Sequence, residues 1–142
     1  MVAETPEDID AAVQRLRRLC AIPGHPRQLG WDIEWKGTFT HGPPRRTSLM
    51  QFCVRPLPPA RPLCVLLRLC RVPGEDGGMG GVTPALRSLL EDETIKKVGV
   101  QARGDGHKIM RDFKISVASV VELKDYAAAR APVPGERLTM MR

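Results

Sequence analysis

The first predicted helix is marked by apolar residues three and four positions apart. Residues 5–8 (Thr-Pro-Glu-Asp) have the capping threonine, first-turn proline and acidic residues typical of a helix start. Prolines and a glycine in residues 21–28 should end this helix. Its apolar face comprises Ile9, Ala12, Val13, Leu16 and Leu19.

Five later segments have the composition of strands. They are residues 29–35, 48–54, 63–72, 96–101 and 117–123. Two helices are predicted between the later strands, one after Thr83-Pro84 with Leu86, Leu89 and Leu90 inside, and one opening at Gly104-Asp105 with Ile109, Met110 and Phe113 inside. The first three strands are adjacent in sequence, which favours an antiparallel meander. The later strands alternate with helices, which favours parallel crossover connections. The pattern predicts a mixed α/β sheet.

Length and charge limit the function classes. A chain of 142 residues is long enough for one domain. The net charge is +6, but residues 1–10 hold four acids and no Lys or Arg, so residues 11–142 carry 22 basic against 12 acidic residues. A body with a net charge of +10 suits a polyanion such as nucleic acid, although ordinary solubility charge also accounts for it.

The cysteines and apolar segments exclude other classes. The four cysteines form no Cys-x-x-Cys pair, which argues against a structural zinc site, and Cys53 and Cys64 are expected to be buried thiols. The N-terminus has no apolar signal core, and the apolar run 63–70 is too short for a membrane span. We expect a soluble, intracellular protein without membrane contact, in the nucleus of a eukaryotic cell.

Two acidic positions could carry chemistry. In the strand Trp31-Asp32-Ile33-Glu34-Trp35 side chains alternate, so Asp32 and Glu34 share one face and the apolar residues the other. Clustered carboxylates suit a hard cation such as Mg²⁺, although a wet acidic strand face has the same pattern. Asp105 follows a strand at a helix start, where α/β proteins bind ligands, but it would also serve as an N-cap.

Five segments in collinear order resemble the DEDD-type 3′-5′ exonuclease domain of the ribonuclease H-like superfamily, and are most similar to the exonuclease domain of the Werner syndrome helicase. They are Trp31 to Trp35, Ser48 to Cys53, Ile95 to Asp105, Met110 to Phe113, and Val121 to Leu123. The likeness runs from about residue 29 to residue 128. It places a helix and linker in 1–28, the family core in 29–128 and a tail in 129–142 of a single domain.

The resemblance implies hydrolysis of phosphodiesters from the 3′ end with two Mg²⁺ or Mn²⁺ ions. Asp32 would bridge both ions, Glu34 would bind the ion that activates water, and Asp105 the ion on the leaving-group side. Nucleic acid would be the substrate, with DNA favoured over RNA although no residue distinguishes the two, a helicase or other protein would be a partner, and DNA repair would be the context. Substrate contacts are predicted at Arg45, Arg46, Trp35 and Lys108.

One family motif is missing. The family's late Tyr-x-x-x-Asp supplies a fourth carboxylate, but Tyr126 is followed four residues on by Arg130, and Asp125 is a poorly placed substitute. We therefore expect a domain incomplete at its C-terminal helices, with an uncovered sheet face that favours self-association. The alternatives are a degenerate exonuclease fold that binds nucleic acid or protein without catalysis, and an unrelated α/β domain.

Overall fold

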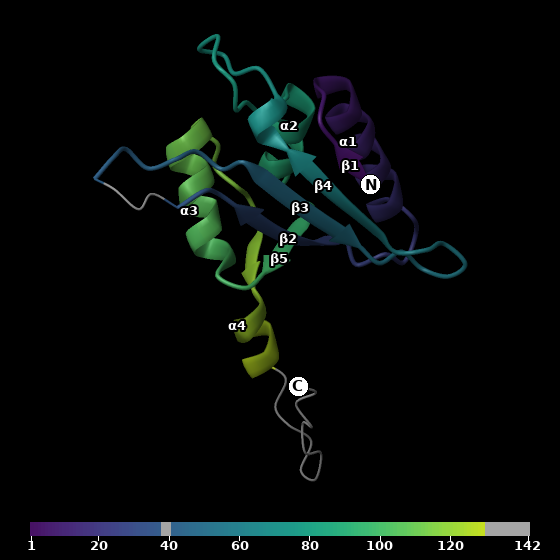
Figure 1. The fold of residues 1–142 in the computed structure, drawn as a ribbon. Helices are drawn as coiled ribbons and strands as arrows, with labels where there is room; N and C mark the ends of the chain where they lie inside the picture. Colours follow the sequence, from purple (N-terminus) through teal and green to yellow (C-terminus); the bar gives the residue numbers. More distant parts are fainter. Residues whose placement is uncertain (38–40, 130–142) are drawn as a thin grey trace.

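A computed structural model describes residues 1–37 and 41–129 (Figure 1). The strands are β1 (Val2–Ala3), β2 (Gln28–Glu34), β3 (Leu49–Val54), β4 (Leu63–Arg68), β5 (Lys96–Gly99) and β6 (Val120–Glu122). The helices are α1 (Pro6–Cys20), a 3₁₀ turn η1 (Leu69–Arg71), α2 (Pro84–Glu91), α3 (Ala102–Phe113) and α4 (Leu123–Ala128). None of the described helices is long and apolar enough to cross a membrane.

The six described strands form one mixed sheet in the order β1-β4-β3-β2-β5-β6. β2, β3 and β4 make the predicted antiparallel meander, and β5 and β6 add in parallel to β2. The α/β prediction is therefore confirmed. The strand β1 and the helix α4 were not predicted, and the segment 63–72 is shorter as a strand, because it turns into η1 after Arg68.

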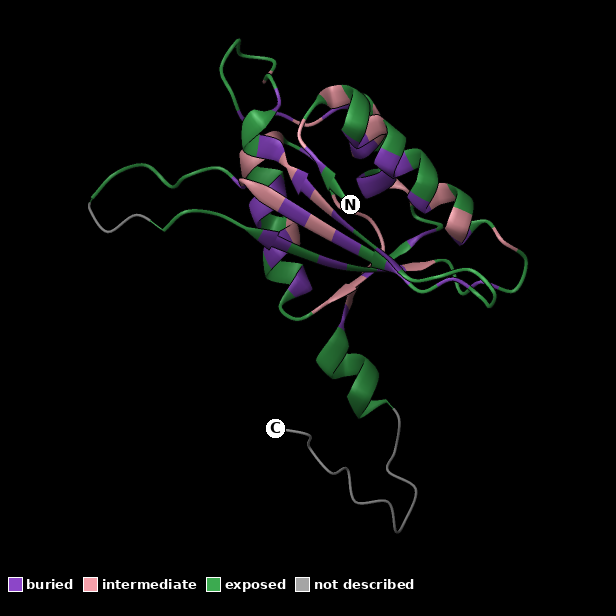
Figure 2. Cartoon of the chain, turned by 45° about the vertical axis from the view of Figure 1, so that its right-hand side comes forward, coloured by how far each residue is buried: buried purple, intermediate pink, exposed green. Residues whose placement is uncertain are grey.

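Buried and more exposed residues alternate along the central strands (Figure 2), which gives the sheet two different faces. Trp31 and Ile33 of β2 lie beside Phe52 and Met50 of β3, and all four are at most 3% exposed. These residues share one core cluster with the buried residues of α1, α2 and α3, so the three helices cover this face. The opposite face carries Asp32, Glu34 and Cys53, which are exposed. In the described part of the chain, one face holds the core and the other faces solvent.

Helix starts follow the predicted capping chemistry in two of three cases. The Thr5 hydroxyl accepts from the Asp8 amide at 3.1 Å, and the Thr83 hydroxyl accepts from the Leu86 amide at 3.2 Å. The third helix, α3, begins at Ala102, before the predicted Gly104. Met110, expected inside it, is 42% exposed, so that assignment was wrong.

The cysteine prediction was also wrong for two residues. Cys53 and Cys64 face each other across β3 and β4, are exposed, and are joined as a disulfide with Cα atoms 4.3 Å apart. Their neighbours Phe52 and Val54 point into the core, and period-two alternation therefore turns Cys53 to the open face. The predicted tail 129–142 lies outside the described residues except for Ala129.

Candidate active site at the carboxyl edge of the sheet

The predicted acidic residues gather at one edge of the sheet. β2, β5 and β6 are parallel, so their carboxyl ends meet at the same edge. Glu34 ends β2, with Asp32 two residues earlier, and Asp105 lies in the first turn of the helix that follows β5. This is the edge where open α/β sheets place their ligands. We call Asp32, Glu34, Asp105 and Glu122, which ends β6, the acid edge.

Close backbone packing brings β5 to this edge. A Cβ atom built on Gly99 would overlap the carbonyl oxygen of Trp31, which directly precedes Asp32. Glycine at position 99 therefore allows β5 to lie against β2 and start α3 beside the acidic strand. The chain enters α3 through Gln101, which has a left-handed backbone with φ of 57°.

Glu122 is a site residue that sequence reasoning did not single out. It is 5% exposed, and its Oε1 accepts a hydrogen bond of 2.8 Å from the backbone N–H of Arg103, the second residue of α3. The N-cap residue of this helix, Gln101, makes no side-chain capping bond. Glu122 therefore caps α3 from a neighbouring strand, a role that depends on tertiary structure and leaves no local signal.

Asp105 lies in a negative field. Burial, followed by the charges of Asp32, Glu122 and Glu34, raises the pKa of its carboxyl group to about 6. The residue is 8% exposed, and its Oδ2 atom is buried without a hydrogen-bond partner in the described residues. A buried carboxylate oxygen without a donor is costly, and a cation would relieve both the missing contact and the repulsion.

The donor set fits a hard divalent cation that is shared with substrate. Within residues 1–37 and 41–129, no three His, Cys, Asp or Glu side chains are grouped so that they could hold a metal ion by themselves. Mg²⁺, however, is commonly held by one or two carboxylates, waters and substrate phosphates. The carboxylate oxygens of Asp32, Glu34 and Asp105 are donors of that kind, and the unpartnered Oδ2 of Asp105 is the observation that favours a cation here.

The predicted substrate residues lie next to the acid edge on α3 and the segment that follows β2. Lys108 is three residues after Asp105, and its ammonium lies 4.8 Å from the ring centroid of Trp35. That ammonium also donates to the Arg45 carbonyl oxygen at 2.8 Å. Trp35, predicted to share the face of Trp31, follows the end of β2 and is 45% exposed. The structure thus brings Trp35 and Lys108 together, and Lys108 contacts Arg45 through the Arg45 backbone carbonyl.

Contacts of Asp112 that were not predicted fix this segment to α3. Lys108 lies 3.1 Å from the Asp112 carboxylate, and both side chains are less than 10% exposed. The Asp112 Oδ2 accepts from the backbone N–H of Thr47 at 2.7 Å and from its hydroxyl at 2.8 Å. The chain between β2 and β3 is therefore tied to the helix that carries Asp105.

The proposed substitute for the fourth carboxylate is engaged elsewhere. The Asp125 carboxylate accepts from the Arg103 guanidinium at 2.9 Å, and both side chains are more than half exposed. Asp125 is not among the groups that shift the pKa of Asp105, whereas Glu122 is. Within the described residues, Glu122 is the fourth carboxylate of this edge.

The raised pKa of Asp105 predicts a pH-dependent stability in the absence of metal. Between pH 4 and 6 the folded protein holds a proton on Asp105 that the unfolded chain has lost, so stability should fall as pH rises through this window and then level off. The loss should be at most about 3 kcal/mol. Thermal unfolding in EDTA from pH 4 to 7.5 measures it.

Asp105→Asn provides the comparison, because the amide does not titrate. At pH 7.5 in EDTA this variant should be more stable than the wild type, and added Mg²⁺ should raise the Tm of the wild type more than that of the variant. Parallel stability profiles for the two proteins from pH 4 to 7 would contradict the assignment.

The capping role of Glu122 predicts a separate stability effect. Glu122→Ala leaves the Arg103 N–H at the start of α3 without its acceptor, and should lower the free energy of unfolding by about 1–2 kcal/mol. Glu122→Gln keeps an acceptor oxygen and should lose less. Urea titrations of both variants measure the difference, and equal stabilities for Ala and Gln would show that the hydrogen bond contributes nothing.

Comparisons with known proteins identify the family. The family model described as 3′-5′ exonuclease matches residues 3–134. The chain is 33% identical over 99 residues to the bifunctional 3′-5′ exonuclease/ATP-dependent helicase WRN of Mus musculus, covering 70% of this chain and 6% of that protein. It is 38% identical over 97 residues to the exonuclease 3′-5′ domain-containing protein 2 of Drosophila melanogaster, covering 68% of this chain and 14% of that protein.

Solved structures show the same fold. The EXD2 exonuclease domain soaked in Mg and GMP matches with a TM-score of 0.69 and 28% identity, covering 92% of this chain and 58% of that one. The same domain soaked in Mn and dGMP matches equally well. The chain therefore matches only part of each relative, from 6% of the mouse protein to 58% of the EXD2 domain. By its sequence, its ribonuclease H-like sheet and its match to the family model, the chain belongs to the DEDD-type 3′-5′ exonuclease family.

Proposed function

We propose that this chain hydrolyses nucleic acid from the 3′ end, with divalent cations held by Asp32, Glu34 and Asp105. The observation that carries the proposal is the buried, unpartnered Oδ2 of Asp105 in the field of Asp32 and Glu34. Soaks of the related EXD2 domain with Mg and Mn support the choice of cation. Two ions of Mg²⁺ or Mn²⁺, when bound, would stabilise the attacking and leaving oxygens of an in-line displacement.

The residues at and around the acid edge would have different roles in this reaction. Asp32 and Glu34 project from the open face of β2, where a strand of nucleic acid can approach from solvent. Asp105 completes the carboxylate set from α3, and Glu122 holds the start of that helix in place. Gly99 allows β5 to lie close to β2. With cations bound by these carboxylates, the scissile phosphate would be held in a fixed orientation.

The direct test uses 5′-labelled single-stranded and double-stranded DNA and RNA with Mg²⁺ or Mn²⁺. A ladder of products shortened from the 3′ end, absent in EDTA and in the Asp32→Ala variant, supports the enzyme. We expect DNA to be degraded faster than RNA. Cleavage that persists in EDTA, or in Asp32→Ala, would rule the proposed site out.

A second candidate function is nucleic-acid binding without hydrolysis. It is favoured by the sequence, in which Arg130 stands where the family's Tyr-x-x-x-Asp motif would place its acid after Tyr126, and by the engagement of Asp125 with Arg103. Binding in EDTA with no metal-dependent ladder would select this function. A longer chain from the same transcript should then restore cleavage if that acid follows residue 142.

Partners and location follow from the same proposal. The mouse relative is a bifunctional exonuclease and helicase, so a helicase is the first protein partner to test by co-purification. The open face of β2, β3 and β4 would mediate self-association, which sedimentation velocity over a range of concentrations measures. A nuclear location is tested by imaging the tagged protein.

A further inference from the structure

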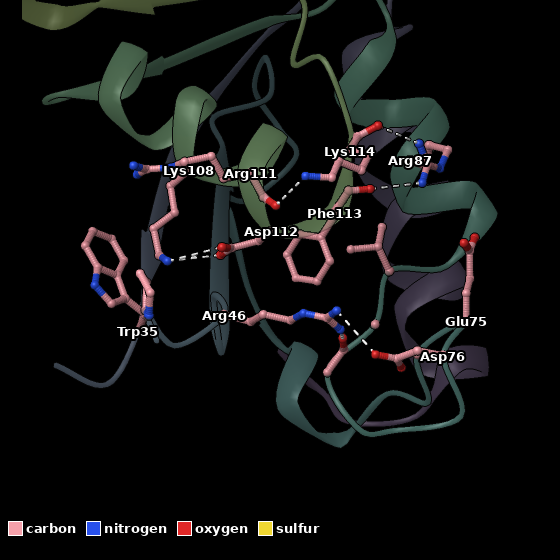
Figure 3. Close-up of a pocket in the computed structure, with 15 residues that line it drawn as sticks. Trp35, Arg46, Glu75, Asp76, Arg87, Lys108, Arg111, Asp112, Phe113 and Lys114 are labelled. Atoms are coloured by element: carbon pink, nitrogen blue, oxygen red, sulfur yellow. Dashed lines mark hydrogen bonds and ion pairs between the residues drawn. The ribbon is translucent and has the colours of Figure 1, made fainter. Parts of the chain in front are cut away.

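A basic pocket lies against α3, the helix that carries Asp105 (Figure 3). It has a volume of about 650 Å³ and is bounded by the C-terminal half of α3, Trp35, and the segments 44–46 and 74–82. Its wall contains five Arg or Lys residues against three acids. The pocket therefore carries net positive charge, and it shares α3 with Asp105.

Two of the five cations are used to hold the structure together. Lys108 pairs with the buried carboxylate of Asp112. Arg87 donates to the backbone carbonyl oxygens of Phe113 and Lys114 at 3.3 and 3.4 Å, and so caps the end of α3. These two residues shape the pocket, and their charges are largely committed.

The other three cations, Arg46, Arg111 and Lys114, present charge to solvent. Arg111 is exposed, and no ion pair of its guanidinium occurs within the described residues. The Lys114 ammonium donates to the Arg111 carbonyl oxygen at 3.2 Å. Arg46 lies 3.3 Å from Asp76, but both side chains are about half exposed, and such surface pairs are weak. A polyanion could contact all three.

Trp35 adds an aromatic surface to the same pocket. The residue is 45% exposed, and the Lys108 ammonium lies 4.8 Å from its ring centroid, a favourable cation–π contact. Exposed aromatic rings beside spaced cations are the combination that binds single-stranded nucleic acid, because bases stack on the ring while phosphates contact the cations. A small anion would need donors that converge on one point, and these cations are spread over α3 and a loop.

We propose that this pocket binds the backbone of one nucleic-acid strand upstream of the nucleotide at the acid edge, with phosphates on Arg46, Arg111 and Lys114 and a base on Trp35. This proposal rests on the proposed function, because the bound backbone belongs to the same nucleic-acid strand whose 3′ end would be hydrolysed at the acid edge. Asp105 and Arg111 are six residues apart on α3, a rise of about 9 Å, which about two nucleotides span. Oligonucleotides shorter than about three nucleotides should therefore bind weakly.

The test separates binding from hydrolysis. Anisotropy of 5′-fluorescein-labelled oligothymidylates of 2, 4, 8 and 12 nucleotides is measured in EDTA at low salt. Arg111→Ala and Arg46→Ala should each weaken binding of the 12-mer about three- to tenfold and lower the slope of log K against log salt by about 0.7. Trp35→Ala should weaken it at least fivefold, and Trp35→Phe should restore most of the affinity.

Arg15→Ala, which removes an exposed arginine on α1, is the matched control and should bind like the wild type. Wild-type affinity in the Arg46, Arg111 and Trp35 variants would overturn the pocket, even if the wild type degrades DNA. Binding of the dinucleotide as tightly as the 12-mer, with displacement by inorganic phosphate, would show a simple anion site and overturn it too. Length-dependent binding that the variants weaken, without any ladder in Mg²⁺, would support the pocket and reject the proposed hydrolysis.

Discussion

Asp32→Asn is expected to lower metal-dependent hydrolysis at least about 1,000-fold. The amide has the size of the carboxylate but lacks its charge, and a bound cation that loses such a ligand gives up several kcal/mol of transition-state stabilisation. Asp32 is exposed on the open face, so the fold should be unaffected. Initial rates on a 5′-labelled oligonucleotide with saturating Mg²⁺ measure the effect.

The loss should be selective for chemistry. Binding of the oligonucleotide in EDTA should be unchanged or slightly tighter, because one negative charge has been removed. Asp125→Asn serves as the comparison, since this exposed carboxylate pairs with Arg103 and is not among the groups that shift the pKa of Asp105. It should keep most of the activity. An Asp32→Asn protein with more than a tenth of wild-type activity would refute the assignment of Asp32, and a loss in Asp125→Asn as large as that of Asp32→Asn would make Asp125 the fourth acid.

Gly99→Ala is expected to destabilise the fold by about 3 kcal/mol or more. The added methyl group would overlap the carbonyl oxygen of Trp31, and neither backbone can move without breaking the pairing of β2 with β5. Since α3 follows β5, the displacement should also move Asp105 away from Asp32. Urea unfolding gives the stability, and hydrolysis by the folded fraction gives the effect on the site.

Gly104→Ala is the matched control for this change. Nothing lies within 4 Å of a Cβ built there, and alanine favours the helical backbone of α3. This variant should gain about 0.5–1 kcal/mol. If the two alanine variants were equally stable, close approach of β5 to β2 would not be what requires glycine at position 99.

The sheet and its acidic residues could be predicted because their signals are local. Alternation along β2 placed Asp32 and Glu34 on one face, and capping residues marked the starts of α1 and α2. The two-residue strand β1 has no periodicity to detect. It exists because its backbone pairs with Leu66 and Leu67 of β4, a contact more than sixty residues away in sequence.

The residues that support the site could not be predicted, since their roles depend on tertiary contacts. Glu122 caps a helix from another strand, and Asp112 pairs with Lys108 while accepting two hydrogen bonds from Thr47. Lys97 is fully buried, where burial lowers the pKa of its ammonium to about 8, and it donates to the Asp92 carbonyl oxygen at 2.7 Å. Charged residues of this kind are usually exposed, so sequence alone indicates a surface position.

The two-faced sheet makes the tolerance of β2 to mutation depend on whether the residue number is odd or even. Odd positions such as Trp31 and Ile33 fill the core, so most substitutions there should reduce the amount of folded protein in a cell. Even positions such as Asp32 and Glu34 contribute little to the core. Substitutions at them should leave abundance unchanged while removing activity, so a scan that scores abundance and activity separately would show the two properties alternating residue by residue along a single strand.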